Sequence, residues 1–176
     1  MSNVATVCAA AERQTDEIIG ASAAIKRAAS LALRFAPTRM PVLLVGPTGT
    51  GKELLARCIH AWSGVCGQLV DVNCGALPRD LVEAQLFGYR RGAFTGAVED
   101  AAGLVEAADG GTLFLDELCS LAGEAQVKLL RVVETGEFRR LGETKKRRAG
   151  LRLVAASQSL EGGILGGSVL RSDLRH

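Results

Sequence analysis

The chain lacks the hydrophobic signals of membrane and exported proteins. It contains no run of about eighteen apolar residues, and its first residues do not follow the basic-then-apolar pattern of a secretory signal. The sequence therefore indicates neither a membrane-spanning helix nor an exported protein, and we expect a cytoplasmic location. The chain is also short of net charge, because 21 Lys and Arg residues nearly match 19 Asp and Glu residues. Overall charge thus gives no argument for a nucleic acid or a membrane as the partner.

Cysteine patterns that indicate disulfides or zinc are absent too. The five cysteines are odd in number and include no C-x-x-C pair. Neither a disulfide framework nor a zinc site is therefore indicated. We interpret all five as reduced and mostly structural: Cys8, Cys58, Cys66, Cys74 and Cys119.

The composition is that of one globular domain, in which two kinds of segment alternate. The 176 residues are 48% hydrophobic and 23% charged, which suits a single core. Continuous apolar runs predict buried strands, at residues 41–46, 68–72, 112–117 and 151–157. Helical spacing predicts helices, at residues 22–36, 52–62, 78–87 and 123–135.

Strands that alternate with helices predict an α/β fold with a parallel sheet covered on both faces. In such a fold, functional residues gather at the carboxyl ends of the strands. Residues 88–99 and 139–150 interrupt the alternation, and long loops of this kind are often functional. Residues 159–176 carry four glycines and are expected to end in an incomplete helix.

Residues 46–52, GPTGTGK, fit the G-x-x-x-x-G-K phosphate-binding loop and lie between an expected strand and an expected helix, as that motif requires. The glycines allow backbone N–H groups to face phosphate oxygens, and the following helix adds positive potential at its N-terminus. Lys52 would reach the β- and γ-phosphates. The alternative is a glycine-rich turn without a ligand, and the flanking strand and helix argue against it.

Glu53 stands where a Ser or Thr hydroxyl usually coordinates magnesium, so another acidic residue must supply more of the metal coordination. LFLDE, residues 113–117, supplies acids at a strand end. Asp116 can hold Mg²⁺, and Glu117 can orient and polarise the water that attacks the phosphate. The two carboxylates could instead cap the next helix, but their combination with the phosphate loop favours an ATPase site.

Several segments, in order, resemble the sigma-54-dependent transcriptional activators, which are the bacterial enhancer-binding proteins of the AAA+ superfamily. The segments lie within residues 18–176 and read GPTGTGKELLARCIH, VNCGAL, LFGYRRGAFTGA, AADGGTLFLDE, KLLRVVETGEFRRLG and DLRH. GAFTGA is the most specific of them. Glu53 is usual in this family, whereas Pro47 stands where many members have Glu. The resemblance implies a P-loop NTPase domain of three αβα layers, which hydrolyses ATP with Mg²⁺ as a hexameric ring and acts on sigma-54 of bacterial RNA polymerase.

The resemblance assigns the GAFTGA loop to contact sigma-54, so that ATP turnover moves the loop and converts the closed promoter complex into an open one. Phe94 and Thr95 would be the main contacts, because small flanking residues permit a movable tip and an exposed aromatic can anchor a contact. The alternative is that Phe94 folds back into the core, as phenylalanines usually do. The implied contact residues are Gly92, Ala93, Phe94, Thr95, Gly96 and Ala97.

Further site residues follow from the resemblance. Asn73 matches the asparagine that holds the catalytic Glu117 in an inactive pose; the alternative is a strand-end asparagine satisfied by backbone. Ser157 and Gln158 match a pair that senses the γ-phosphate, although Thr-Asn is commonest there. Arg171 matches the first arginine finger, which reaches the ATP of the neighbouring subunit. The implied nucleotide contacts are Gly46, Pro47, Thr48, Gly49, Thr50, Gly51, Lys52, Glu53, Ala108, Asp109, Gly110, Gly111, Asp116, Glu117, Ser157 and Gln158.

A basic cluster at residues 139–148 lies where the family has its second pore loop. The sequence favours a solvated hairpin over direct DNA contact, because the overall charge is weak. Lys128 and Arg131 lie a helical turn apart and could equally be surface charges.

The expected domains are a polar leader, residues 1–17, and an AAA+ core, residues 18–176, that is incomplete at its C-terminal end, without the helical lid and without a sequence-specific DNA-binding domain. Three functions stay open. The first is the ATP-hydrolysing core of a sigma-54 activator. The second is a truncated fragment that binds nucleotide or sigma-54 without turnover, and the third is a general AAA+ remodelling ATPase, which GAFTGA disfavours.

Overall fold

A computed structural model gives the structure of the protein, and it describes residues 23–159 together with the backbone of residues 170–173. The helices are α2 (Ala23–Phe35), α3 (Lys52–Trp62), α4 (Val82–Phe87), α5 (Leu104–Ala107) and α6 (Gly123–Thr135), with 3-10 turns η1 (Cys74–Ala76), η2 (Arg79–Leu81) and η3 (Leu118–Ser120). The main strands are β1 (Val42–Val45), β2 (Leu69–Asn73), β5 (Thr112–Asp116), β8 (Arg152–Ser157) and β9 (Leu170–Asp173). Two short pairs complete the set: β3 (Gly88–Tyr89) with β4 (Ala101–Ala102), and β6 (Glu137–Phe138) with β7 (Arg147–Arg148).

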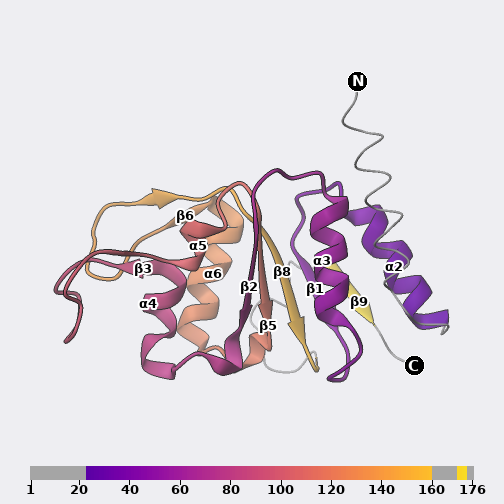
Figure 1. Ribbon diagram of the computed structural model, residues 1–176, viewed down its shortest axis with the longest axis horizontal. Coiled ribbons are helices and arrows are strands. Elements are labelled where there is room, and N and C mark those ends of the chain that lie inside the picture. The colour runs from indigo at the N-terminus through magenta and orange to yellow at the C-terminus, as the bar shows by residue number, and fades with distance from the viewer. Residues whose placement is uncertain (1–22, 160–169, 174–176) are drawn as a thin grey trace.

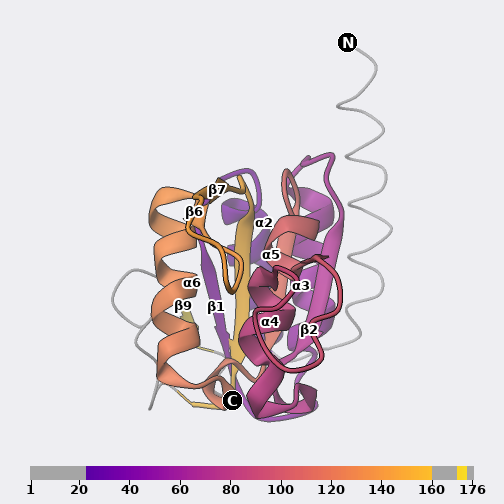
Figure 2. The same ribbon diagram turned by 90° about the vertical axis from the view of Figure 1, so that its left-hand side faces the viewer.

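The main sheet has five parallel strands in the order β2-β5-β8-β1-β9. Helices α2 and α3 cover one of its faces, and α4, α5 and α6 lie on the other, so that the molecule has three layers (Figures 1 and 2). Helical crossovers connect the first four of these strands: α3 lies between β1 and β2, α4 and α5 lie between β2 and β5, and α6 lies between β5 and β8. The fold is therefore the α/β class with a parallel sheet that the alternation of segments predicts.

The three central strands β5, β8 and β1 divide their side chains between two cores. In β5, Leu113 and Leu115 face α4 and α6, whereas Phe114 faces α2 and α3. Successive side chains of a strand point to opposite faces, so a strand covered on both sides must be apolar at every position. All four residues of β1 are buried for this reason.

The expected element boundaries hold closely in the described part of the chain. Helices α3 and α6 begin and end as the spacing predicts, and the four expected strands lie within two residues of their predicted limits. The expected incomplete helix is wrong at residues 170–173, which form β9 instead and pair with the free edge of β1. The polar leader, residues 1–17, and Cys8 lie outside the described residues.

Arg152, at the start of β8, fixes the end of α2. Its buried side chain donates hydrogen bonds to the carbonyl oxygens of Ala36, at 2.5 Å, and Phe35, at 3.0 Å. The last carbonyls of a helix have no partners within the helix, and a cation suits their partial negative charge. Burial, and then the charge of Arg152, lower the pKa of His60, whose Nδ1 lies 2.8 Å from the Thr112 hydroxyl oxygen.

No helix of the described ranges is both long enough and apolar enough to cross a membrane.

Candidate active site

The phosphate-binding loop connects β1 to α3 at the carboxyl edge of the sheet. It begins where the Gly46 N–H donates to the Ser157 carbonyl oxygen at 3.1 Å, which ties the ends of β1 and β8 together. Gly49 and Gly51 have φ angles of 81° and 83°. These left-handed conformations favour glycine, and they let the chain turn back on itself before the helix begins. The sequence motif therefore adopts the strand, loop and helix context that it needs to hold phosphate.

Lys52, the first residue of α3, extends back over the loop. Its Nζ donates to the carbonyl oxygens of Gly46 and Pro47, each at 2.9 Å, and the residue is 8% exposed. An ammonium group has three N–H donors, so two of them fix the side chain and one is left for a ligand. The Thr50 hydroxyl donates to the Pro47 carbonyl oxygen at 2.8 Å and closes the same turn.

The acidic pair lies at the end of β5. Asp116 is the last residue of that strand, and its Oδ1 accepts the Glu117 N–H at 2.9 Å. Glu117 has φ 54° and ψ 45°, and it is the one non-glycine residue with a positive φ in the described ranges. Such strain costs on the order of 1–3 kcal/mol and is concentrated at functional sites. Asp116 therefore holds the backbone of Glu117 in the conformation in which the carboxylate lies over Gly75.

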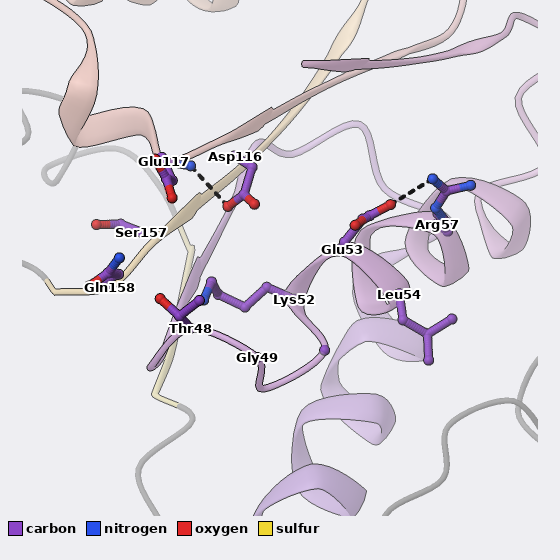
Figure 3. Close-up of a pocket in the computed structure, with 11 residues that line it drawn as sticks. Thr48, Gly49, Lys52, Glu53, Leu54, Arg57, Asp116, Glu117, Ser157 and Gln158 are labelled. Carbon is purple, nitrogen blue, oxygen red and sulfur yellow. Dashed lines mark hydrogen bonds and ion pairs between the residues drawn. The ribbon is translucent and has the colours of Figure 1, made fainter. Parts of the chain in front are cut away.

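A cavity of about 440 Å³ lies between the loop and the acidic pair (Figure 3). It contains most of the predicted site, together with two residues that the sequence reasoning did not select, Leu54 and Arg57. Its lining residues are Thr48, Gly49, Gly51, Lys52, Glu53, Leu54, Arg57, Asp116, Glu117, Ser157 and Gln158.

Arg57 holds Glu53 to one side of this cavity. The Arg57 NH2 group lies 2.6 Å from Glu53 Oε1 and 3.2 Å from Asp71 Oδ2, a residue of β2. Burial, then the charge of Glu53 and further that of Asp116, raise the pKa of Asp71, and Arg57 opposes this effect. Glu53 and Arg57 are four residues apart on α3, a spacing that the sequence does reveal. The contact with Asp71 depends on the fold.

Asn73 caps the turn beside the acidic pair. Its Oδ1 accepts the N–H groups of Gly75 at 2.8 Å and Ala76 at 3.3 Å. Backbone N–H groups thus satisfy the side-chain oxygen of Asn73, as the alternative interpretation of this residue expects. The role of Asn73 in holding Glu117 inactive stays a prediction. Burial, then Asp116 and Glu117, raise the pKa of the adjacent Cys74 thiol to about 12, so this cysteine is structural, as expected.

The predicted nucleotide contacts at residues 108–111 lie away from this cavity. These residues precede β5, at the opposite end of that strand from Asp116, and they do not line the cavity. Contact with the nucleotide stays a prediction for them, and in this structure they contribute to the fold. The Asp109 Oδ1 accepts the Gly150 N–H at 2.7 Å, and Gly111 packs against the backbone of Gln68 too closely for a Cβ.

Comparison with known proteins places the chain in a family. Residues 18–176 match the family described as the Sigma-54 interaction domain. The chain belongs to this family. The sequence-based recognition and the AAA+ type of fold are thereby confirmed.

Relatives of this sigma-54 interaction domain include the Nif-specific regulatory protein of Rhodobacter capsulatus, which is 48% identical over 167 residues, covering 94% of this chain and 29% of the relative. The nitric oxide reductase transcription regulator NorR2 of Cupriavidus necator is 49% identical over 162 residues, which cover 91% of this chain and 31% of the relative. The chain thus spans less than a third of these relatives. Among solved structures, NtrX from Brucella abortus in complex with ADP is 35% identical, with a TM-score of 0.74 over 93% of this chain and 36% of that one. NtrX in complex with ATP is 38% identical, with a TM-score of 0.72 over 90% of this chain and 36% of the NtrX chain.

The GAFTGA segment of this sigma-54 interaction domain forms a closed turn at the side of the molecule remote from α2 (Figure 1). The Gly92 N–H donates to the Ala97 carbonyl oxygen at 2.8 Å, and Gly92 and Gly96 have φ angles of 83° and 99°. Ala97 is 6% exposed, so its side chain offers no surface to a partner. A contact of Ala97 with sigma-54 stays a prediction.

Phe94 lies neither in the core nor fully in solvent. It is half-buried, and its ring meets Tyr89 edge to face with the centroids 5.0 Å apart. Contacts of this kind contribute about 0.5–1.5 kcal/mol. Val98, immediately after the turn, is 77% exposed. The apolar side chains of Phe94 and Val98 thus both lie outside the core.

The base of the GAFTGA segment is fastened to the second loop. Arg90 N–H donates to the Leu141 carbonyl oxygen at 3.0 Å, and Leu141 N–H donates to the Gly88 carbonyl oxygen at 2.9 Å. The Arg90 side chain reaches Asp100 at 3.1 Å and Glu143 at 3.7 Å. Backbone hydrogen bonds and an ion pair therefore join the two loops.

The basic cluster is largely ion-paired. It follows β6 and includes β7, which pair as an antiparallel hairpin; the hairpin is thus confirmed, and its exposure to solvent in place of DNA stays a prediction. Arg147 bonds Glu143 at 2.8 Å, and its hydrogen bonds lower the pKa of Glu143. Arg140 bonds Glu106 at 2.8 Å, and Lys146 bonds Glu137 at 2.7 Å.

Arg171 lies in β9, beside Leu43 of β1. Its side chain is outside the described part of the structure, and its role as an arginine finger stays a prediction.

Proposed function

We propose that this domain binds and hydrolyses ATP and uses the energy to move the GAFTGA segment against sigma-54. The observation that carries the proposal is the meeting of Lys52, Asp116 and Glu117 in one cavity, with the phosphate-binding loop on one side and the acidic pair on the other. The relative NtrX has been solved with ADP and with ATP, which supports adenine nucleotides as the ligands.

Each residue of the cavity has a chemical task in this proposal. Backbone N–H groups of the loop and the N-terminus of α3 hold phosphate oxygens, and the remaining Lys52 donor reaches the β- and γ-phosphates. Glu117 orients and polarises the attacking water. Ser157 and Gln158 line the same cavity and sense the presence of the γ-phosphate.

Magnesium fits this donor set. Mg²⁺ is usually held by one or two carboxylates together with substrate phosphates and water, and not by an all-protein cage. The described residues contain no group of three or more His, Cys, Asp or Glu side chains arranged to hold a metal ion. Asp116 supplies one carboxylate beside the phosphate loop, and Mg²⁺ would neutralise phosphate charge there. Arg57 keeps Glu53 in an ion pair, so Asp116 is the acid that we assign to the metal.

Ring assembly completes the proposed site. Arg171 would reach the ATP of the neighbouring copy and stabilise the charge that develops during transfer of the phosphoryl group. Turnover in a hexamer would then move the segment that carries Phe94 and Thr95, and this motion would remodel the closed promoter complex into an open one. The family match supports sigma-54 as the partner.

The test is phosphate release measured over a range of protein concentrations, in this chain and in a version extended past His176. Glu117→Gln should lower kcat by a factor on the order of 100 or more while ATP binding persists, because only water activation is lost. Glu124→Gln, which alters an exposed carboxylate on α6, is the control. Unchanged turnover in Glu117→Gln would refute the catalytic assignment. Absence of turnover in both chains at every concentration would favour a domain that binds nucleotide without hydrolysing it.

A further inference from the structure

A second large hollow lies away from the nucleotide site, between the second half of α6 and the β6–β7 hairpin. We name it the α6 groove, and its volume is about 640 Å³. Its apolar lining residues are Phe87, Phe138 and Leu141, and Thr135 together with charged side chains of α6 and the hairpin forms the rest of its wall. The proposed ATPase mechanism uses none of these side chains.

The charges of the α6 groove are unevenly compensated. Five cations and two carboxylates line it. Three of the cations have carboxylate partners: Lys128 with Glu83 at 2.7 Å, Arg140 with Glu106 at 2.8 Å, and Lys146 with Glu137 at 2.7 Å.

Arg131 and Arg139 are the exceptions. Both are exposed, and neither forms an ion pair with any carboxylate in the described ranges. Arg131 projects from α6 and Arg139 directly follows β6, so the two guanidinium groups come from opposite walls of the groove. The groove therefore combines apolar lining residues with two guanidinium groups that form no ion pair within the described ranges.

We propose that the α6 groove docks an acidic polypeptide segment of a protein partner, with carboxylates on Arg131 and Arg139 and an apolar side chain against Phe138 and Leu141. Guanidinium groups bind carboxylates in two-pronged geometry, which gives direction as well as energy. A nucleic acid fits less well, since Glu134 and Glu137 also line the groove and would repel a closely spaced row of phosphates. An apolar interior likewise suits a side chain better than a sugar-phosphate backbone.

The docking site adjoins the base of the GAFTGA segment. Leu141, which lines the groove, exchanges backbone hydrogen bonds with Gly88 and Arg90 on either side of Tyr89. A bound segment would therefore touch the residue that fastens the two loops together. Docking in this groove depends neither on ATP hydrolysis nor on sigma-54.

The experiment uses a fluorescein-labelled decapeptide of alternating Glu and Leu, with fluorescence anisotropy as the readout. Arg131→Glu/Arg139→Glu should weaken binding by a factor of about ten or more, because attraction becomes repulsion at both contacts. Arg27→Glu/Arg79→Glu alters the net charge equally at exposed residues outside the groove and should retain binding. Phe94→Ala should also retain binding, which separates this test from that of the GAFTGA segment.

Each contrary outcome points to another occupant or to none. Equal loss in Arg27→Glu/Arg79→Glu would mean nonspecific charge attraction, and no binding of the peptide by the wild type would refute the docking site. A ten-nucleotide DNA strand that binds with the same dependence on Arg131 and Arg139 would identify a nucleic acid site. Sedimentation that detects self-association lost in the double variant would identify a second copy of the chain as the occupant. Thermal melting checks folding, and Arg131→Gln/Arg139→Gln replaces the double variant if the latter does not fold.

Discussion

The Glu117 carboxylate lies directly over Gly75, so that a Cβ at position 75 would collide with Glu117 Oε2. The backbone N–H of Gly75 is fixed at the same time by Asn73 Oδ1, at 2.8 Å. The side chain of the proposed catalytic Glu117 can therefore take this position only because residue 75, two residues after the end of β2, is a glycine. This dependence links the two carboxyl strand ends that lie side by side in the sheet.

Gly75→Ala should displace the Glu117 carboxylate and lower kcat for ATP hydrolysis by a factor of about ten, which corresponds to about 1.4 kcal/mol in the barrier. The free energy of unfolding should alter by less than about 1 kcal/mol, because the end of a flexible glutamate side chain can move aside. Phosphate release and thermal melting measure the two quantities. Gly150→Ala, at a glycine remote from the cavity where a Cβ meets only ordinary contacts, is the control for turnover. Normal turnover in Gly75→Ala would show that the catalytic pose differs from this one.

Phe94→Ala should separate the output of the domain from its ATPase activity. Removal of the edge-to-face contact with Tyr89 should lower the free energy of unfolding by about 0.5–1.5 kcal/mol, and turnover should stay within about twofold of wild type because Phe94 is not in the cavity. Binding to sigma-54 in the presence of a transition-state analogue of ATP should be lost, as measured by native gel shift. Leu81→Ala removes another partly exposed apolar side chain and should retain binding. A Phe94→Ala chain that does not fold would assign this ring to the core.

The proposed nucleotide site is largely predictable from sequence because its residues lie at or after the ends of three apolar runs. Asp116 and Ser157 are the last residues of β5 and β8, Lys52 follows β1 after one loop, and parallel strands bring their carboxyl ends to one edge. Asp71 could not be predicted to contact Arg57, since that ion pair depends on how α3 lies across β2. Residues 108–111 are predicted as site residues because they belong to the motif AADGGTLFLDE, which ends at the acidic pair. The five residues of β5 nevertheless separate residues 108–111 from the cavity.

The loops could be predicted only as interruptions of the helix and strand pattern. Nothing in the sequence spacing places Glu143 beside Arg90, because they are 53 positions apart and belong to different loops. The charges predict the hairpin, but one of the carboxylates that compensate them, Glu106, comes from α5, outside the hairpin. Packing of separate segments decides such pairs, and a local pattern does not encode it.

Glu143→Gln should loosen the connection between the two loops. Glu143 accepts hydrogen bonds from Arg147 and faces Arg90, and Arg147 lowers the pKa of its carboxyl group. Amide hydrogen exchange at Arg90 and Leu141 should become faster by a factor of about ten, since local opening governs their exchange. Glu137→Gln, which breaks pairs with Lys146 and Arg148 on the same hairpin, should leave both amides slow.

The same carboxylate makes the connection dependent on pH. Its pKa is lower in the folded protein than in the unfolded chain, so the ion pairs stabilise the loops above the unfolded value of 4.5. That stabilisation is lost as the pH falls through the folded value. Exchange at the two amides, corrected for its intrinsic pH dependence, should therefore become faster in acid in the wild type and depend less on pH in Glu143→Gln. An identical pH dependence in both would mean that Glu143 does not hold the loops.

His60 should lower the stability of the whole domain at mildly acidic pH. Burial and the Arg152 charge lower its pKa below the ordinary 6.5, so the unfolded chain binds a proton that the folded protein does not. The free energy of unfolding should therefore decrease as the pH falls below about 6.5 and level off below the folded pKa. His60→Gln keeps a polar contact for the Thr112 hydroxyl and should flatten urea unfolding measured between about pH 7.5 and 5. His176→Gln alters the other of the two histidines and is the control. If both variants keep the wild-type slope, carboxylates and not His60 cause the loss of stability in acid.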